Sequence, residues 1–114
     1  MSGEDLQDEQ ASFDQDCPPV PGFPGALVRH MPIINKKGLH ARATAKFVQC
    51  VDRFKSDIKV HRCGETVGGT SIMGILTLGA GIGSTITVAA IGEDAEQALD
   101  AIAALVASKF GEEA

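Results

Sequence analysis

One histidine stands where a short loop meets a predicted helix, with an arginine two residues later, in the segment Gly38-Leu39-His40-Ala41-Arg42. If His40 is the N-cap, its ring lies beside the unpaired backbone amides of Ala41 and Arg42, which with the positive end of the helix dipole form an anion site. The guanidinium of Arg42 adds a planar fork that matches phosphate oxygens. The dipole also disfavours a charged imidazole, so the ring tends toward its nucleophilic form. This pattern predicts a phosphoryl acceptor.

The same five residues also fit a surface histidine that only caps a helix, and the local pattern favours neither interpretation. No acid–base partner for His40 is evident in the neighbouring sequence. None is needed if separate donor and acceptor proteins supply the remaining chemistry.

The other candidate residues carry weaker signals. His61-x-Cys63 has a metal-like spacing, but two ligands do not make a site. Gly79-x-Gly81-x-Gly83 leads into a strand and lacks the Lys-Ser/Thr of a nucleotide loop. Cys50 is expected to pack on a helix and His30 to be a strand residue without a role. We therefore expect no metal and no cofactor.

The residue pattern predicts seven elements around these positions. Strands are expected over 26–34, 58–62, 66–69 and 85–91, and helices over 41–54, 72–78 and from 94 to near 111. Thr70 or Ser71 is expected to cap the second helix, and Asp94 with Gln97 to form a capping box on the third, with Gly111 at its end and Lys109 in its last turn. The order βαββαβα predicts an α+β open-faced sandwich, with a four-stranded antiparallel sheet covered on one face by three helices.

Composition divides the 114 residues into a tail and one domain. Residues 1–24 hold six of the 15 acidic residues, none of the ten Lys and Arg, and four of the five prolines, so we expect a disordered acidic extension there and a folded domain over 25–114. The near-neutral domain has few aromatics, which argues against nucleic-acid binding. No signal peptide or membrane span is evident, and three cysteines without C-x-x-C predict no disulfide framework. We expect a cytoplasmic monomer.

Two motifs in register resemble one protein family. Gly38-Leu39-His40-Ala41-Arg42 is similar to the active-site motif of HPr, the histidine-containing phosphocarrier of the phosphotransferase system. The segment Ser71-Ile72-Met73-Gly74-Ile75 is similar to the regulatory-serine motif of that family, at the family's spacing. The resemblance covers about residues 26–110, and the predicted order of elements agrees with the HPr fold.

The resemblance implies a role for each matching residue. Enzyme I would transfer a phosphoryl group to Nδ1 of His40, and His40 would pass it to an enzyme IIA domain, while Arg42 and the amides of Ala41 and Arg42 stabilise the transferring group. Ser71 would be a target of HPr kinase/phosphorylase, although a plain N-cap serine fits it equally well. The resemblance also implies an apolar docking patch, for which the candidate residues are Leu39, Phe47, Ile72, Met73 and Leu76.

Three departures and two alternatives accompany the resemblance. Ala43 stands where the family usually has proline, Thr44 stands where a small residue is usual, and the acidic extension is atypical.

The alternatives are a regulatory paralogue of the nitrogen-related branch and an HPr-like module that docks without being phosphorylated. A stand-alone enzyme is disfavoured because no second catalytic group accompanies His40.

Overall fold

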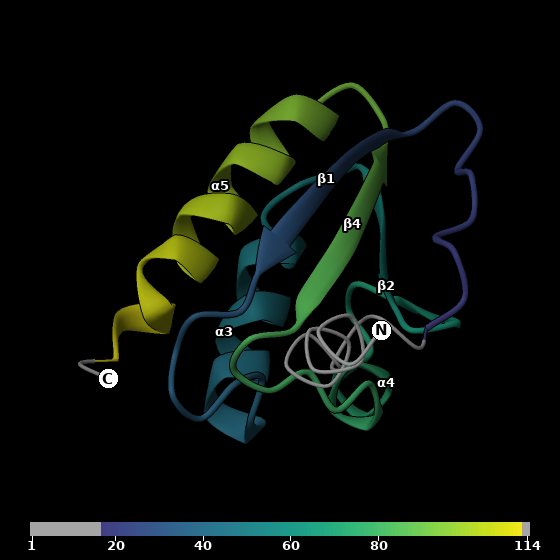
Figure 1. Ribbon diagram of the computed structural model, residues 1–114. Helices are drawn as coiled ribbons and strands as arrows, with labels where there is room; N and C mark the ends of the chain where they lie inside the picture. Colours follow the sequence, from purple (N-terminus) through teal and green to yellow (C-terminus); the bar gives the residue numbers. More distant parts are fainter. Residues whose placement is uncertain (1–16, 113–114) are drawn as a thin grey trace.

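The computed structural model describes residues 17–112, which form four strands and three α-helices (Figure 1). Their order confirms the predicted βαββαβα arrangement. The elements are β1 (Leu27–Pro32), α3 (Ala41–Asp52), β2 (Asp57–Arg62), β3 (Glu65–Gly68), α4 (Ile72–Thr77), β4 (Thr85–Ile91), α5 (Ala95–Ala107) and a 3₁₀ turn (Lys109–Gly111).

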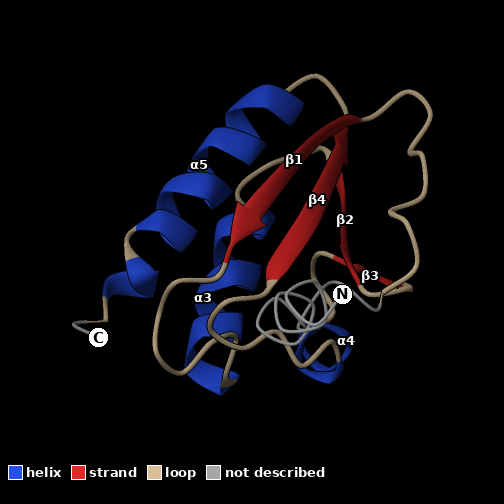
Figure 2. Cartoon of the chain, viewed as in Figure 1, coloured by secondary structure: helices blue, strands red, loops and turns tan. Residues whose placement is uncertain are grey.

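The strands form one antiparallel sheet in the order β1-β4-β2-β3 (Figure 2). Successive side chains of a strand point to opposite faces. In the central strand β4, Ile86, Val88 and Ala90 belong to the hydrophobic core, while Thr87 and Ala89 alternate with them on the other face. We call the face that carries Lys59, His61, Thr87 and Ala89 the outer face of the sheet.

The helices cover the core face of the sheet, which confirms the open-faced sandwich. Helix α5 packs against β1 and β4, and α3 packs against both α4 and α5. Phe47 of α3 and Ile102 of α5 are completely buried, as the three- and four-residue spacing of apolar residues in these helices predicts. The helices and the sheet therefore share one core, and the loops between them lie at its ends.

The start of α5 differs from the prediction. Asp94 occupies the N-cap, but its side chain makes no cap hydrogen bond. Its carboxylate instead accepts hydrogen bonds from the backbone N–H groups of Lys55 (2.8 Å) and Ser56 (3.0 Å) and from the Ser56 hydroxyl (2.5 Å). The capping-box prediction with Gln97 is therefore wrong, because this carboxylate ties the start of α5 to the segment before β2.

The end of α5 also differs from the prediction. The helix stops at Ala107, and the chain turns through Lys109 (φ 59°), Phe110 (φ 56°) and Gly111 (φ 78°). Lys109 therefore lies beyond the last turn of α5 rather than in it. The turn buries Phe110 and directs the following residue, Glu112, back toward α3.

The expectation of no disulfide is wrong, because Cys17 is bonded to Cys63. Spacing along the chain could not reveal this pair, since 46 residues separate the two cysteines. Residues 1–16 lie outside the described residues, so the predicted disordered extension stays a prediction there. Residues 17–24, which belong to the same predicted extension, follow a defined path beside the sheet.

Candidate functional site

His40 is the N-cap of α3, as predicted. Its backbone is extended (φ −80°, ψ −177°), and its side chain does not cap the helix. The first intrahelical hydrogen bond runs from Thr44 N–H to His40 O (2.8 Å), so the amides of Ala41 and Arg42 precede the ladder and point out of the end of the helix. The ring of His40 is 27% exposed, which leaves it accessible to a partner protein.

The loop before His40 is fixed by close backbone contacts. Leu39 N–H donates to Ala80 O (2.9 Å), and Gly38 has a φ of +66°. A Cβ at Gly38 would lie 2.5 Å from Ala80 O and 2.7 Å from Gly81 Cα. A side chain at position 38 would therefore push the loop away from residues 80–81, and the glycine of the motif serves close packing as well as a positive φ.

Glu112 is the functional neighbour of His40 that the sequence did not reveal. One of its carboxylate oxygens, Oε2, is hydrogen-bonded to Nε2 of His40, and the other accepts from Asn35 Nδ2 (3.0 Å). The hydrogen bond with His40 and then that from Asn35 hold the pKa of Glu112 below its usual value. The neighbouring sequence shows no acid–base partner for His40, and the tertiary structure supplies one from 72 residues away.

Two further contacts hold Glu112 in place. Asn35 is completely buried and also donates to Gly38 O (2.9 Å), so a single amide connects Glu112 to the loop before His40. Lys46 of α3 donates to Phe110 O (2.7 Å) and fixes the turn after α5. A sequence pattern could not show this arrangement, because Glu112 and His40 are 72 residues apart.

The carboxylate determines which ring nitrogen of a neutral His40 can act as a nucleophile. A carboxylate accepts hydrogen bonds and does not donate them, so Nε2 carries the hydrogen that points to Glu112. Nδ1 then keeps its lone pair. The arrangement orients an imidazole with a free nucleophilic nitrogen at the N-terminus of a helix, where an anion is stabilised.

Arg42 and Ala41 are exposed on the first turn of α3, within two residues of His40 in the chain. The following positions, Ala43 and Thr44, are buried, and the Thr44 hydroxyl donates to Leu39 O (3.3 Å). Thr44 therefore holds the loop through its hydrogen bond to Leu39. The Arg42 guanidinium and the amides of Ala41 and Arg42 are the groups that face an incoming anion.

The second predicted motif lies at the start of α4. Ser71 is its N-cap, and the Ser71 hydroxyl oxygen accepts a hydrogen bond from Gly74 N–H (3.1 Å). Ser71 is exposed, as are Ile72 (44%) and Met73 (71%), and Leu76 is half-buried. Helix α4 packs against α3, so this apolar surface belongs to the same side of the molecule as the helix that His40 caps.

Two of the predicted docking residues are buried. Phe47 is fully buried in the core and Leu39 is 6% exposed. Neither side chain presents an appreciable surface to a partner, so neither suits the predicted docking patch.

The weaker candidates have structural partners. Nδ1 of His61 is hydrogen-bonded to Thr66 Oγ1 (2.8 Å), and Nδ1 of His30 to Thr87 Oγ1 (2.9 Å). Cys50 is a free, half-buried thiol whose pKa is raised by burial. Within residues 17–112 there is no group of three or more His, Cys, Asp and Glu arranged to hold a metal, and no helix there has the length and apolar character needed to span a membrane.

Comparison with known proteins connects this geometry to a single family. Residues 28–108 match the family model described as PTS HPr component phosphorylation site. The phosphocarrier protein HPr of Cupriavidus necator is 51% identical over 86 residues, which cover 75% of this chain and 97% of the relative. The phosphocarrier protein NPr of Shewanella violacea is 43% identical over 86 residues, covering 75% and 94%.

A solved structure agrees with these relatives. The crystal structure of HPr-C-His from Thermoanaerobacter tengcongensis superposes with a TM-score of 0.74 at 43% identity and covers 77% of this chain and 99% of that one. The segment that contains Cys17 and the position of Glu112 both lie outside the residues that match the family model.

Proposed function

The chain belongs to the HPr family of phosphocarrier proteins, and on this basis we propose that it accepts a phosphoryl group from enzyme I on Nδ1 of His40 and passes it to an enzyme IIA. One observation carries the proposal. Glu112 holds Nε2 of His40, so the other ring nitrogen is free at the N-terminus of α3. The protein is then a carrier with a covalent intermediate rather than a stand-alone enzyme.

The transfer exchanges one P–N bond for another. The lone pair of His40 Nδ1 attacks the phosphorus of the phosphohistidine on enzyme I, and the electron pair of the breaking bond returns to the donor's imidazole. Positive charge develops on the ring of His40 and is stabilised by the carboxylate at Nε2. The amides of Ala41 and Arg42 and the Arg42 guanidinium meet the phosphoryl oxygens. Transfer to an enzyme IIA reverses these steps.

The exposed apolar residues Ile72, Met73 and Leu76 are the proposed docking surface for both partners. Met73 is the most exposed of the three, and its flexible thioether suits a surface that accommodates more than one partner. We further propose Ser71 as a target of HPr kinase/phosphorylase. A phosphate there adds about −2 charge beside the docking surface, which would weaken docking of an acidic partner.

A second candidate function uses the same chemistry with a different recipient. The 43% identity to the NPr of Shewanella violacea supports a regulatory carrier of the nitrogen-related branch, which would deliver the phosphoryl group to a regulator instead of a sugar permease. An HPr-like module that docks without phosphorylation is a third. In either carrier role we propose a cytoplasmic monomer that uses no cofactor.

The deciding experiment uses labelled phosphoenolpyruvate and the cognate enzyme I. We expect an acid-labile, base-stable label on the intact protein, its loss in His40→Ala, and its retention in His30→Ala, which removes an exposed strand histidine instead. Absence of label in the intact protein would refute both carrier proposals and leave the docking module. Label that persists in His40→Ala would place the acceptor elsewhere.

Two further measurements separate the finer proposals. Adding candidate enzyme IIA domains to the labelled protein shows whether a sugar-transport or a regulatory recipient takes the label. For Ser71, incubation with ATP and HPr kinase should give modification that disappears in Ser71→Ala and survives in Thr70→Ala, the adjacent exposed hydroxyl. Modification that survives in Ser71→Ala contradicts the assignment.

A further inference from the structure

A short segment runs beside the outer face of the sheet, between the turn that joins β2 to β3 and the start of β1. We call residues 17–26 the strap; it is the purple segment that leads into β1 in Figure 1. At one end Cys17 is bonded to Cys63, and at the other the chain enters β1 at Leu27. The strap is joined to the domain at both ends, covalently in each case.

The strap covers side chains that an open sheet face would leave in solvent. His61 and Thr87 are each 3% exposed and Ala89 is 2% exposed, although all three lie on the outer face. Phe23 of the strap approaches the His61 ring edge-on, with the centroids 6.2 Å apart. The strap therefore turns this part of the outer face into a buried layer.

Regular backbone pairing with the sheet does not hold the strap there. Four of its ten residues are prolines, which have no N–H to donate, so it cannot pair with the sheet as a regular strand. Hollows remain under it, one lined by Val20 and Thr87 and another by Gly22 and Ala89. The disulfide is the covalent attachment of the strap at Cys17.

Cys63 occupies a position that turn chemistry does not favour. Cys63 and Gly64 form the two-residue turn between β2 and β3, with φ values of +49° and +84°. Such turns prefer Asn, Asp or Gly at the first position, because other residues resist a positive φ. A cysteine that does not suit the turn conformation, exposed to solvent, points to a role for its sulfur.

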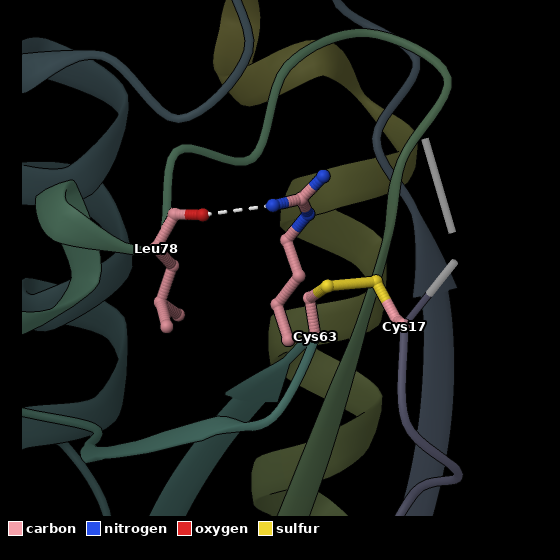
Figure 3. Close-up of a disulfide and its surroundings, with 4 residues drawn as sticks. Cys17, Cys63 and Leu78 are labelled. Atoms are coloured by element: carbon pink, nitrogen blue, oxygen red, sulfur yellow. Dashed lines mark hydrogen bonds between the residues drawn. A yellow bond between two sulfur atoms is a disulfide. The ribbon is translucent and has the colours of Figure 1, made fainter. Parts of the chain in front are cut away.

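The Cys63 end of the bond is anchored and the Cys17 end is not part of the sheet. Cys63 sits in the β-hairpin, and the neighbouring Arg62 donates from Nη1 to Leu78 O (3.0 Å), which holds the hairpin against the end of α4 (Figure 3). If the sulfur–sulfur bond opens, the hairpin keeps its position while the strap loses its covalent attachment at Cys17.

We propose that Cys17 and Cys63 form a thiol–disulfide switch, opened by a dithiol reductant, that releases residues 17–26 from the outer face of the sheet. A thiolate of the reductant attacks Sγ of the exposed Cys63, and Cys17 leaves as a thiolate that takes up a proton. The second thiol of the reductant then attacks the mixed disulfide and frees Cys63. Two electrons pass from the dithiol to the protein, and the reductant becomes a disulfide. The inference is independent of His40 chemistry.

The first measurement counts thiols in the full-length protein. Oxidised protein, labelled with a maleimide after unfolding, should carry one label on Cys50, and protein treated with a thioredoxin-class dithiol should carry three. The change should reverse on oxidation. A disulfide that stays closed with that reductant would be a permanent structural link and would overturn the proposal.

The second measurement asks whether the strap leaves the sheet. A nuclear Overhauser effect between the rings of Phe23 and His61 should be present in oxidised protein and lost after reduction. Cys17→Ser should lose it without reductant, and the control Cys50→Ser should keep it and respond to reductant like the unmodified protein. Persistence of this signal in the reduced protein or in Cys17→Ser would show that contacts other than the disulfide hold the strap, which refutes the switch.

Discussion

The loop that carries His40 and the strap are both fixed by residues far away in sequence, but by different kinds of bond. Around His40, the contacts are directional hydrogen bonds. Leu39 N–H donates to Ala80 O, and the Glu112 carboxylate is hydrogen-bonded to both His40 and Asn35. The strap is linked to the hairpin between β2 and β3 by one disulfide. Several directional bonds orient a reacting atom, whereas one covalent link fixes only proximity and can be opened by a redox reaction.

The two regions also differ in their relation to the HPr family. The match to the family covers residues 28–108, which includes the whole His40 motif and none of the strap. The His40 motif and Cys63 therefore lie within the matched residues, whereas Cys17 and Glu112 lie outside them. Changes confined to one region should leave the other intact, and the following predictions test this separation.

The largest expected loss of stability follows from a substitution in the loop before His40. Gly38→Ala should lower the free energy of unfolding by about 3 kcal/mol, because its Cβ would lie 2.5 Å from Ala80 O at a φ of +66°. Gly64→Ala is the matched control near the strap: its φ is +84°, but its nearest contact is an ordinary 3.4 Å to Pro18, so about 1 kcal/mol is expected. Urea denaturation measures both, and equal losses would contradict the close packing inferred at Gly38.

A smaller effect is expected at the carboxylate behind His40. Glu112→Gln should slow phosphoryl transfer from enzyme I about tenfold, because the ring loses the charge that orients it and stabilises it as the bond forms. Single-turnover rates with labelled enzyme I measure this, with Glu65→Gln on the exposed edge strand as the control. An unchanged rate would make Glu112 a structural contact only.

Opening the disulfide should affect stability less than its loop length suggests. Chain entropy alone predicts about 4 kcal/mol for a link across 46 residues. Because the released strap also gains conformational freedom in the folded protein, we expect Cys17→Ser to lower the free energy of unfolding by only about 1 to 2 kcal/mol. Urea midpoints of Cys17→Ser and of the reduced unmodified protein should coincide. A loss of stability near the chain-entropy value of about 4 kcal/mol would mean that the strap stays on the sheet when the bond is open.

Acid should weaken the fold through two carboxylates on the helix side of the molecule. The pKa of Asp94 is held below its usual value by the Ser56 hydroxyl and then by Lys55 N–H, and that of Glu112 by His40 and then Asn35. Both carboxylates therefore stabilise the fold above their unfolded pKa values and lose that contribution as the pH falls through the folded ones.

Urea midpoints from about pH 6 down to about pH 2.5 measure this effect. Asp94→Asn and Glu112→Gln should each flatten the fall in stability over the acid range. Burial lowers the pKa of His61, so protonation of its ring in acid opposes the contact with Phe23, and this contact should also weaken as the pH falls. A contact between Phe23 and His61 that persists unchanged to about pH 2.5 would contradict the expected cost of charging the buried ring.

Most of the fold was predictable because its signals are local. The alternation in β4 and the three- and four-residue spacing in α3 and α5 follow from which side chains must face the core. Ser71 caps α4 as expected for the same reason, since the hydroxyl reaches an amide only three residues away. The ends of the elements were less predictable, because packing of Phe110 rather than propensity ends α5.

The sequence by itself determined the position of His40 at the start of a helix, with Arg42 in its first turn, because consecutive residues build that site. Only the tertiary structure decided that Glu112 orients the ring, that Asp94 binds the segment before β2 rather than its own helix, and that Cys17 finds Cys63. These partners are separated by 38 to 72 residues. These long-range contacts form only when packing of the whole core brings the segments together, so no local sequence pattern predicts them.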